Sequence, residues 1–437
     1  MKRFTCCPLE NIPDELEPGL EYFSLYSSYK PRRANVGHIA IQLQRDIRRA
    51  GIEVSSLAWD FASIALSVVA ADSACSRSNS ADGWTRQIEV NIYLQDPLIW
   101  YSQKTNLEQT FRFLTGDFWK LNFLPGGSGP PRPNRSQLRR YDSDCVSLVS
   151  GGVDSLVGAI DLSSSGEQPI FISRIVTGDK EIQNQIAERL GATERHFQWS
   201  FTSPSPNERE TSSRGRSLIF FAYAILAASA LESSDEPVPI YVPENGFISL
   251  NIALTPSRLG SLSTKTTHPI YLKGLQNVLD AVGINARLVF PLGYQYKTKG
   301  EIIEGCLDPD LLLDLVPNST SCGKYGRHKK THCGRCVPCL VRRAAFLRAG
   351  IDDPTSPSTA FGRPYVFMDL SRALSEKSSQ DIRAAASAYL RYKQQGINSL
   401  IRGGLSFASS QERNQYKGVV ERGIEEIGQL LIHHGVI

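Results

Sequence analysis

The sequence shows almost no excess of one charge. Its 48 basic and 44 acidic residues give a formal net charge of +4 over 437 residues, too small an excess to indicate a nucleic-acid or membrane partner. The first residues, MKRFTCCPLENIPDELEPG, bring acidic residues and prolines before any apolar run, which is not typical of a signal peptide. The most apolar run, Ser217–Leu231, is too short to span a bilayer and favours a buried core helix. We therefore expect a cytoplasmic protein.

The sequence also lacks internal repeats with a period of about 20–50 residues. A hydrophobic fraction of 41% and a charged fraction of 21% are typical of a globular chain, and the length predicts roughly two to four domains. Nine cysteines in a cytosolic chain indicate metal binding or catalysis before disulfides.

Proline and glycine mark the first boundary. The segment LPGGSGPPRPN, Leu124–Asn134, is typical of a linker, which we place at residues 126–140. Before it, we predict a separate α+β domain over residues 1–125. Its β-rich runs are Ile64–Ala71, the alternating Gln87–Leu94, and Trp119–Phe123.

Residues 141–350 show a different pattern, in which short apolar strands alternate with helices. This alternation predicts an α/β fold with a doubly wound parallel sheet. The expected strands are Cys145–Val149, Pro169–Val176, Arg195–Phe201, Pro239–Val242 and Arg287–Pro291, and the helices are Ser155–Leu162, Lys180–Leu190, Gly215–Glu232 and His268–Ala281. Residues 351–437 are expected to be helical and to end in an amphipathic run, Glu412–Ile432.

A glycine loop, SGGVDS (Ser150–Ser155), lies between the first of these strands and its helix. Glycines let the backbone approach a bulky anion, and the unpaired N–H groups at the start of the helix point toward it. Ser150 and Ser155 add hydroxyl donors. This arrangement predicts phosphate binding; the alternative is an ordinary strand–helix turn. The chain has no GxxxxGK[ST], so the loop is not of the Walker A type.

Four cysteines form the second motif. Cys322 is followed after ten residues by Cys333, Cys336 and Cys339, within SCGKYGRHKKTHCGRCVPCLVRR. Four thiolates at this spacing suit a closed, structural zinc site. An iron–sulfur cluster is the alternative, but Arg343 occupies the place of its fourth cysteine; free thiols are a third reading. His328 and His332 could be further ligands, although a solvated basic loop is the simpler interpretation.

SGGVDS resembles the pyrophosphatase loop of ATP-dependent adenylating enzymes. The resemblance implies that ATP is cleaved between its α- and β-phosphates and that Mg²⁺ and a lysine or arginine meet the developing charge. Arg216 and Lys299 are the candidate cations, and Asp154, Ser155 and Lys299 the candidate catalytic residues. The implied ATP-binding residues are Leu148, Val149, Ser150, Gly151, Gly152, Val153, Asp154, Ser155, Leu156 and Arg216.

The two motifs together resemble the 7-cyano-7-deazaguanine synthase family, called QueC. The similarity runs from about Asp144 to Leu347 and includes RGR before the long helix, KTKGEII and CGRCVPCLVRR. It implies an adenine-nucleotide α-hydrolase-like (PP-loop) fold, a structural zinc, and activation of 7-carboxy-7-deazaguanine as an acyl adenylate by ATP. In that family ammonia then gives an amide, and a second activation gives the nitrile.

This chain departs from the shorter family members. About 140 residues precede the glycine loop and about 90 follow the zinc region. In this it resembles the QueC-like proteins of bacterial anti-phage defence systems, in particular QatC proteins of the Qat system. That resemblance implies partner proteins from a defence operon.

The expected substrate loop, ENGFISLNIALTPSRLGSLSTKTTHP, also differs from the family's. A deazapurine carboxylate needs an acidic partner for its N–H edge and cations near its carboxylate. The candidates are Glu244, Asn245, Arg258, Lys265, Thr267 and His268. The alternative is a polar Ω-type loop with solvated charges. His268 could act as a general base, or could cap the helix that starts at Pro269.

These observations favour an ATP-dependent ligase that adenylates a 7-deazaguanine carboxylate and transfers the acyl group to an amine, of a partner protein or of ammonia. The alternatives are a 7-cyano-7-deazaguanine synthase, a non-catalytic binding subunit that senses a nucleotide or deazapurine, and a nucleic-acid-modifying enzyme. The weak net charge counts against the last, and neither a membrane nor a nucleic acid is expected as a direct partner.

Overall fold

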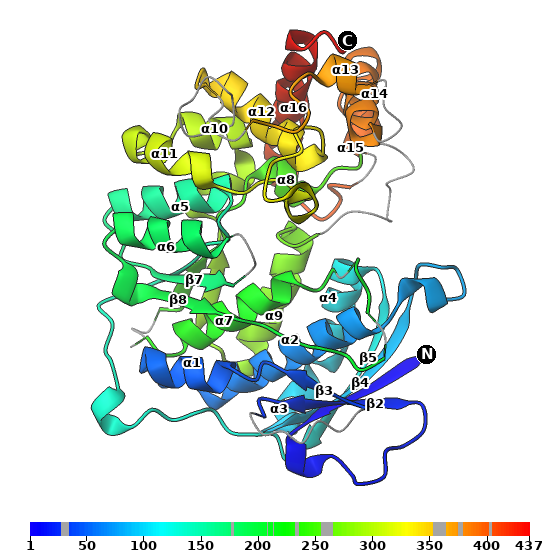
Figure 1. Cartoon of the computed structure of the whole chain (residues 1–437), viewed down its shortest axis with the longest axis vertical. Coiled ribbons are helices and arrows are strands. Elements are labelled where there is room, and N and C mark those ends of the chain that lie inside the picture. Colours follow the sequence, from blue (N-terminus) through cyan, green and yellow to red (C-terminus); the bar gives the residue numbers. More distant parts are fainter. Residues whose placement is uncertain are drawn as a thin grey trace.

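The computed structural model describes residues 1–27, 35–175, 179–207, 209–212, 214–231, 236–254, 265–352, 364–374, 379–401 and 404–437. In Figure 1 the N-terminal sheet lies at the lower end of the molecule and the C-terminal helices at the upper end, with the central sheet between them.

The N-terminal sheet has the strand order β3-β2-β1-β4-β5, and every pairing in it is parallel. Its strands are β1 (Lys2–Cys7), β2 (Leu20–Leu25), β3 (Val36–Ile39), β4 (Gln87–Leu94) and β5 (Phe118–Pro125); its helices are α1 (Leu43–Ala50), α2 (Ser56–Ala74), α3 (Pro97–Ser102) and α4 (Lys104–Thr115). The prediction of an α+β region was therefore wrong. Because parallel strands need crossover connections, this region is α/β, like the region after it.

The predicted strand at Ile64–Ala71 was also wrong, because these residues lie inside α2. Ser55 caps this helix, since its hydroxyl accepts the N–H of Ala58 at 3.2 Å. A helix that is buried on every side shows no apolar stripe, so its sequence looks like a buried strand. By length and composition α2 could cross a membrane, but 89% of its most apolar window is buried inside the protein.

The central sheet confirms the predicted fold. All of its pairings are parallel, in the order β10-β9-β6-β7-β8. Its strands are β6 (Val146–Leu148), β7 (Ile170–Arg174), β8 (His196–Trp199), β9 (Val238–Tyr241) and β10 (Ala286–Val289), and its helices are α5 (Val153–Ser164), α6 (Lys180–Arg189), α7 (Ser217–Ala228) and α9 (Pro269–Val282). The chain turns from one side of β6 to the other, and ligands bind at such a switch point.

Helices fill the space between the two sheets. α2 packs along α7 and α4 packs along α9, so the two sheets share one continuous hydrophobic core (Figure 1). Within the shared core, Asp72 of α2 accepts the backbone N–H groups of Arg214 at 2.8 Å and Gly215 at 2.7 Å. The N-terminal region thus holds the turn that leads into α7.

The C-terminal region is helical, as predicted, and forms a second hydrophobic core. Its helix α16 (Ser410–His433) contains the predicted amphipathic run and packs on α12 (Val337–Ala349), α14 (Gln380–Gln395) and α8 (Gly246–Leu250). The described residues also form the α-helices α10 (Lys299–Glu304), α11 (Pro309–Leu315), α13 (Leu370–Leu374) and α15 (Asn398–Ile401).

Candidate functional site

The glycine loop joins the carboxyl end of β6 to α5. Gly151 has φ = 89°, a left-handed conformation that favours glycine, and Gly152 is the N-terminal cap of α5. The Ser150 N–H donates to the Ser155 hydroxyl at 3.1 Å, and that hydroxyl donates to the Gly152 carbonyl at 3.1 Å. Ser155 is buried and Ser150 is exposed. Ser155 therefore shapes the loop from behind, while Ser150 lies on its open side.

Two segments hold the loop from outside. The Gln183 amide of α6 donates to the Ser150 carbonyl at 3.3 Å and to the Arg174 carbonyl at 3.2 Å. The Thr320 N–H donates to the Gly151 carbonyl at 2.8 Å. These two contacts come from residues far away in the sequence, and no local pattern predicted them.

Behind the loop, three helix starts converge on Asp154, the second residue of α5. Lys299 is the first residue of α10, and its Nζ lies 2.6 Å from Asp154 Oδ1. Asn245 caps α8, because its Oδ1 accepts the Ile248 N–H at 3.0 Å, and its Nδ2 donates to Asp154 Oδ2 at 2.8 Å. The Asp154 and Lys299 side chains are only 7% and 8% exposed. The structure thus brings predicted residues of all three segments together.

Glu244 and Asp154 form a pair of neighbouring carboxyl groups. Burial raises the pKa of Glu244 well above its usual value, and the negative charge of Asp154 raises it further. Burial alone would also raise the pKa of Asp154, but Lys299 and hydrogen bonds from Glu244 and Asn245 lower it. The two shifts run in opposite directions, so the surroundings favour the proton on Glu244 and the negative charge on Asp154.

Arg216, a predicted phosphate cation, is exposed and donates to the Thr211 carbonyl at 3.3 Å. A second cation, Arg174, ends β7 beside the loop and was missed by the sequence analysis. Burial lowers the pKa of Arg174, and the nearby charge of Arg216 lowers it further. A basic residue at the carboxyl end of a strand next to the glycine-loop strand was the signal that could have found it.

The predicted substrate residues separate into two groups. Glu244 and Asn245 lie at Asp154, whereas Lys265 Nζ lies 4.2 Å from the ring centre of Phe113, and the Thr267 carbonyl accepts the Ser249 hydroxyl at 2.6 Å. Arg258 lies outside the described residues. Their roles in binding substrate stay predictions.

His268 is the N-terminal cap of α9, which was the alternative to a general base. Its Nδ1 accepts the Ile270 N–H at 3.2 Å, and its ring lies between Phe113 and Phe407. Burial, with the charge of Lys265, lowers its pKa to about 4. A neutral ring whose Nδ1 lone pair is occupied is suited to capping.

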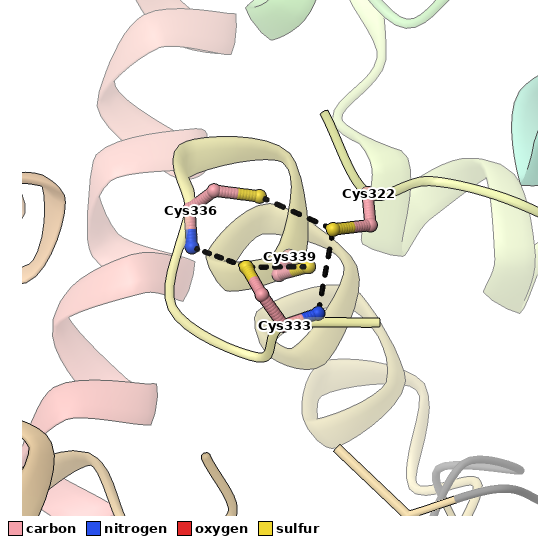
Figure 2. A group of neighbouring side chains, drawn as sticks. All are labelled: Cys322, Cys333, Cys336 and Cys339. Carbon is pink, nitrogen blue, oxygen red and sulfur yellow. Dashed lines mark hydrogen bonds between the residues drawn. The ribbon is translucent and has the colours of Figure 1, made fainter. Parts of the chain in front are cut away.

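The four predicted cysteines come together in one buried cluster (Figure 2). The Sγ atoms of Cys322 and Cys336, and those of Cys333 and Cys339, are each 3.9 Å apart. Tetrahedral Zn²⁺ with Zn–S bonds of about 2.3 Å places its sulfurs about 3.8 Å apart, so the donor set fits the metal. Backbone N–H groups of Lys324, Cys333 and Cys336 point at these sulfurs at 3.3 Å.

Neither nearby histidine belongs to this cluster in the part of the chain that the structure describes. His332 is buried, and its Nε2 accepts the Ser321 N–H at 3.1 Å. It is therefore a structural side chain and not part of a solvated loop. His328 is half-buried on the basic turn.

A cavity of about 860 Å³ lies apart from this site. Its lining includes Ser55, Tyr141, Ser229 and Gly166, which follows the far end of α5. The cavity is therefore at the amino ends of the central strands, opposite the glycine loop.

Comparison with known proteins gives a partial similarity. A 7-cyano-7-deazaguanine synthase of Methanococcus vannielii is 25% identical over 240 residues, 48% of this chain and 97% of that protein. One of Methanothermobacter thermautotrophicus is 25% identical over 244 residues (48% and 97%), and one of Synechococcus sp. 27% over 239 residues (49% and 97%). No family model and no solved structure matches the chain.

The paired carboxyl groups predict unequal losses of stability for two matched substitutions. Asp154→Asn leaves Lys299 buried without a counter-charge and should cost about 3 kcal/mol of unfolding free energy. Glu244→Gln mimics the protonated group, so it should lower the free energy of unfolding only slightly.

The same pair predicts how stability depends on pH. Because the pKa of Glu244 is raised, its stabilising contribution is present at low pH and lost as pH rises through that raised pKa. Urea unfolding at increasing pH should therefore show a smaller decline for Glu244→Gln than for the wild type; equal losses in both variants at neutral pH would contradict this.

The cysteine cluster predicts about one zinc per chain. Cys336→Ser should lose the metal and most of the soluble protein, because structural zinc contributes folding free energy. Cys306→Ser is the matched control, since Cys306 is buried outside the cluster. Elemental analysis of the purified proteins measures this. Iron in the wild type, or full zinc in Cys336→Ser, would show the assignment to be wrong.

Proposed function

We propose that the protein is a QueC-like, ATP-dependent ligase that adenylates 7-carboxy-7-deazaguanine and transfers the acyl group to an amine. The observation that carries the proposal is the glycine loop at the carboxyl edge of a parallel sheet, with Asp154 and Lys299 directly behind it. The similarity to 7-cyano-7-deazaguanine synthases supports the choice of substrate.

In the first step, the N–H groups of the loop and of the first turn of α5 bind the β- and γ-phosphates. A carboxylate oxygen of the substrate attacks the α-phosphorus, the bond to the bridging oxygen breaks, and pyrophosphate leaves. Lys299 has N–H groups beyond the one directed at Asp154, and these stabilise the charge that develops. Asp154, the charged member of the carboxyl pair, offers oxygen atoms that suit Mg²⁺, which would neutralise phosphate charge when bound.

In the second step, an unprotonated amine attacks the acyl carbon, the bond to the AMP oxygen breaks, and the amine loses a proton to solvent. The cysteine cluster takes no part in these steps, since four thiolates leave zinc no open position for substrate.

We further propose that the amine belongs to a partner protein of an anti-phage defence system. The similarity to synthases covers only about half of this chain, so the rest needs another purpose. Docking of a partner makes attack on the adenylate effectively unimolecular, which favours a protein amine over free ammonia. The resemblance to QatC proteins supports this role.

The test combines the protein with ATP, 7-carboxy-7-deazaguanine and its operon partners, and measures AMP and intact masses. A partner should gain the mass of the deazaguanine acyl group. Nitrile formation from ammonia, with no change in any partner mass, would contradict the protein acceptor.

The same assay has a matched control. Ser155→Ala should lower AMP formation by about 100-fold, because the loop loses the hydrogen bonds of the Ser155 hydroxyl to the Ser150 N–H and the Gly152 carbonyl. Ser165→Ala, at the exposed far end of the same helix, should not change it. Equal activity in both variants would remove the loop from the mechanism.

A further inference from the structure

The segment Ser319–Ser321 joins the glycine loop to the cysteine cluster. The Thr320 N–H donates to the Gly151 carbonyl at 2.8 Å, and a Cβ at Gly152 would lie 3.4 Å from the Thr320 carbonyl oxygen. Cys322 follows directly, and the Ser321 N–H donates to His332 beside the cluster. We call Ser319–Ser321 the strap.

Arg342 holds the strap in place. Its side chain is completely buried, and its Nη1 donates to the hydroxyls of Ser319 at 2.8 Å and Ser321 at 3.3 Å. Nη2 donates to the Val316 carbonyl at 3.2 Å. Among the described residues no carboxylate pairs with Arg342, so the carbonyl and hydroxyl oxygens of Val316, Ser319 and Ser321 compensate its buried charge.

The cysteine cluster fixes the N-terminal end of α12, the helix that carries Arg342. Cys336 is the N-terminal cap of α12, and Cys339 lies in its first turn. Arg342 follows Cys339 by three residues, so it lies one turn further along the same helix face. The cluster, Arg342 and the strap therefore form one continuous path to the loop.

This chain of contacts ends at the peptide group between Gly151 and Gly152, whose N–H belongs to the proposed anion-binding loop. The Gly151 carbonyl and the Gly152 N–H belong to the same planar, trans peptide and point in opposite directions. Because Thr320 holds the carbonyl, it also sets the direction of the Gly152 N–H. That N–H points to the Ser150 hydroxyl at 3.3 Å, on the exposed side of the loop.

We propose that Arg342 is a positioning residue for nucleotide binding, which acts through the strap on the peptide between Gly151 and Gly152. The cysteine cluster then serves the nucleotide site as well as the fold of its own loop. This inference rests on the proposed function, because it takes ATP as the ligand of the glycine loop.

The neighbouring arginine provides a matched control. Arg343 is also buried on α12, but it donates to the carbonyls of Gly334 and Phe367 at 3.2 Å and of Met368 at 2.7 Å. None of these groups belongs to the strap. Lysine keeps the charge at either position but cannot reproduce the planar fork of a guanidinium.

The experiment compares Arg342→Lys with Arg343→Lys. For each variant we would measure zinc per chain, ATP affinity by calorimetry, and amide exchange at Gly152 and Thr320. Arg342→Lys should keep its zinc and should bind ATP about tenfold more weakly, as expected for one displaced hydrogen bond. The amide protons of Gly152 and Thr320 should exchange faster in this variant. Arg343→Lys should match the wild type in ATP affinity and in exchange at these amides.

Wild-type ATP affinity in Arg342→Lys, or an equal loss in both variants, would overturn the inference. If Arg342→Lys does not fold, Ser319→Ala removes one acceptor of the same guanidinium and should show the same changes in smaller measure. If the wild type itself binds no ATP, the proposed function fails and Arg342 has no role in nucleotide binding. Amide exchange then tests the geometric part alone: faster exchange confined to Arg342→Lys shows that Arg342 positions the peptide between Gly151 and Gly152, and equal exchange in both variants refutes it.

Discussion

The ion pair between Asp154 and Lys299 is the contact on which the site depends. A buried charge without a partner is strongly unfavourable, so the start of α10 must stay at the start of α5, and Asn245 adds the start of α8. The C-terminal helix supports this junction from behind. Glu426 of α16 accepts the hydroxyl of Thr298, the residue before Lys299, and also pairs with Arg348 at 3.0 Å.

The additional segments hold the central site from two sides. Gly423 of α16 packs against Phe247 of α8, where a Cβ would lie within 2.3 Å of the ring. On the opposite side, Asp72 fixes the backbone of Arg214 and Gly215, just before the predicted cation Arg216. The inner faces of both additional regions thus set the positions of residues that belong to the central fold. A partner protein would have to use their outer faces.

Local patterns predicted the placement of the two motifs and the central fold, but not the fold of the N-terminal region. The glycine loop and the cysteine spacing are short, so their geometry follows from neighbouring residues. The helix α2 has no apolar stripe because it is buried on every side, and it was taken for a strand. Thr320 and Gln183 contact the loop, and Arg342 contacts Ser319 and Ser321 on either side of Thr320. These contacts join residues far apart in sequence, and no single-sequence pattern reports them. His268 was ambiguous because a helix cap and a general base use the same residue type.

Exchange of labelled pyrophosphate into ATP measures adenylation of the substrate carboxylate, because it reports the first chemical step without needing the acceptor. Adenylation is reversible while the acyl adenylate remains bound, so labelled pyrophosphate can replace the pyrophosphate that leaves and re-form ATP. We expect label to enter ATP only when 7-carboxy-7-deazaguanine is present, and we expect Lys299→Met to abolish the exchange. Release of ADP and phosphate, or exchange that does not depend on the carboxylate, would contradict it.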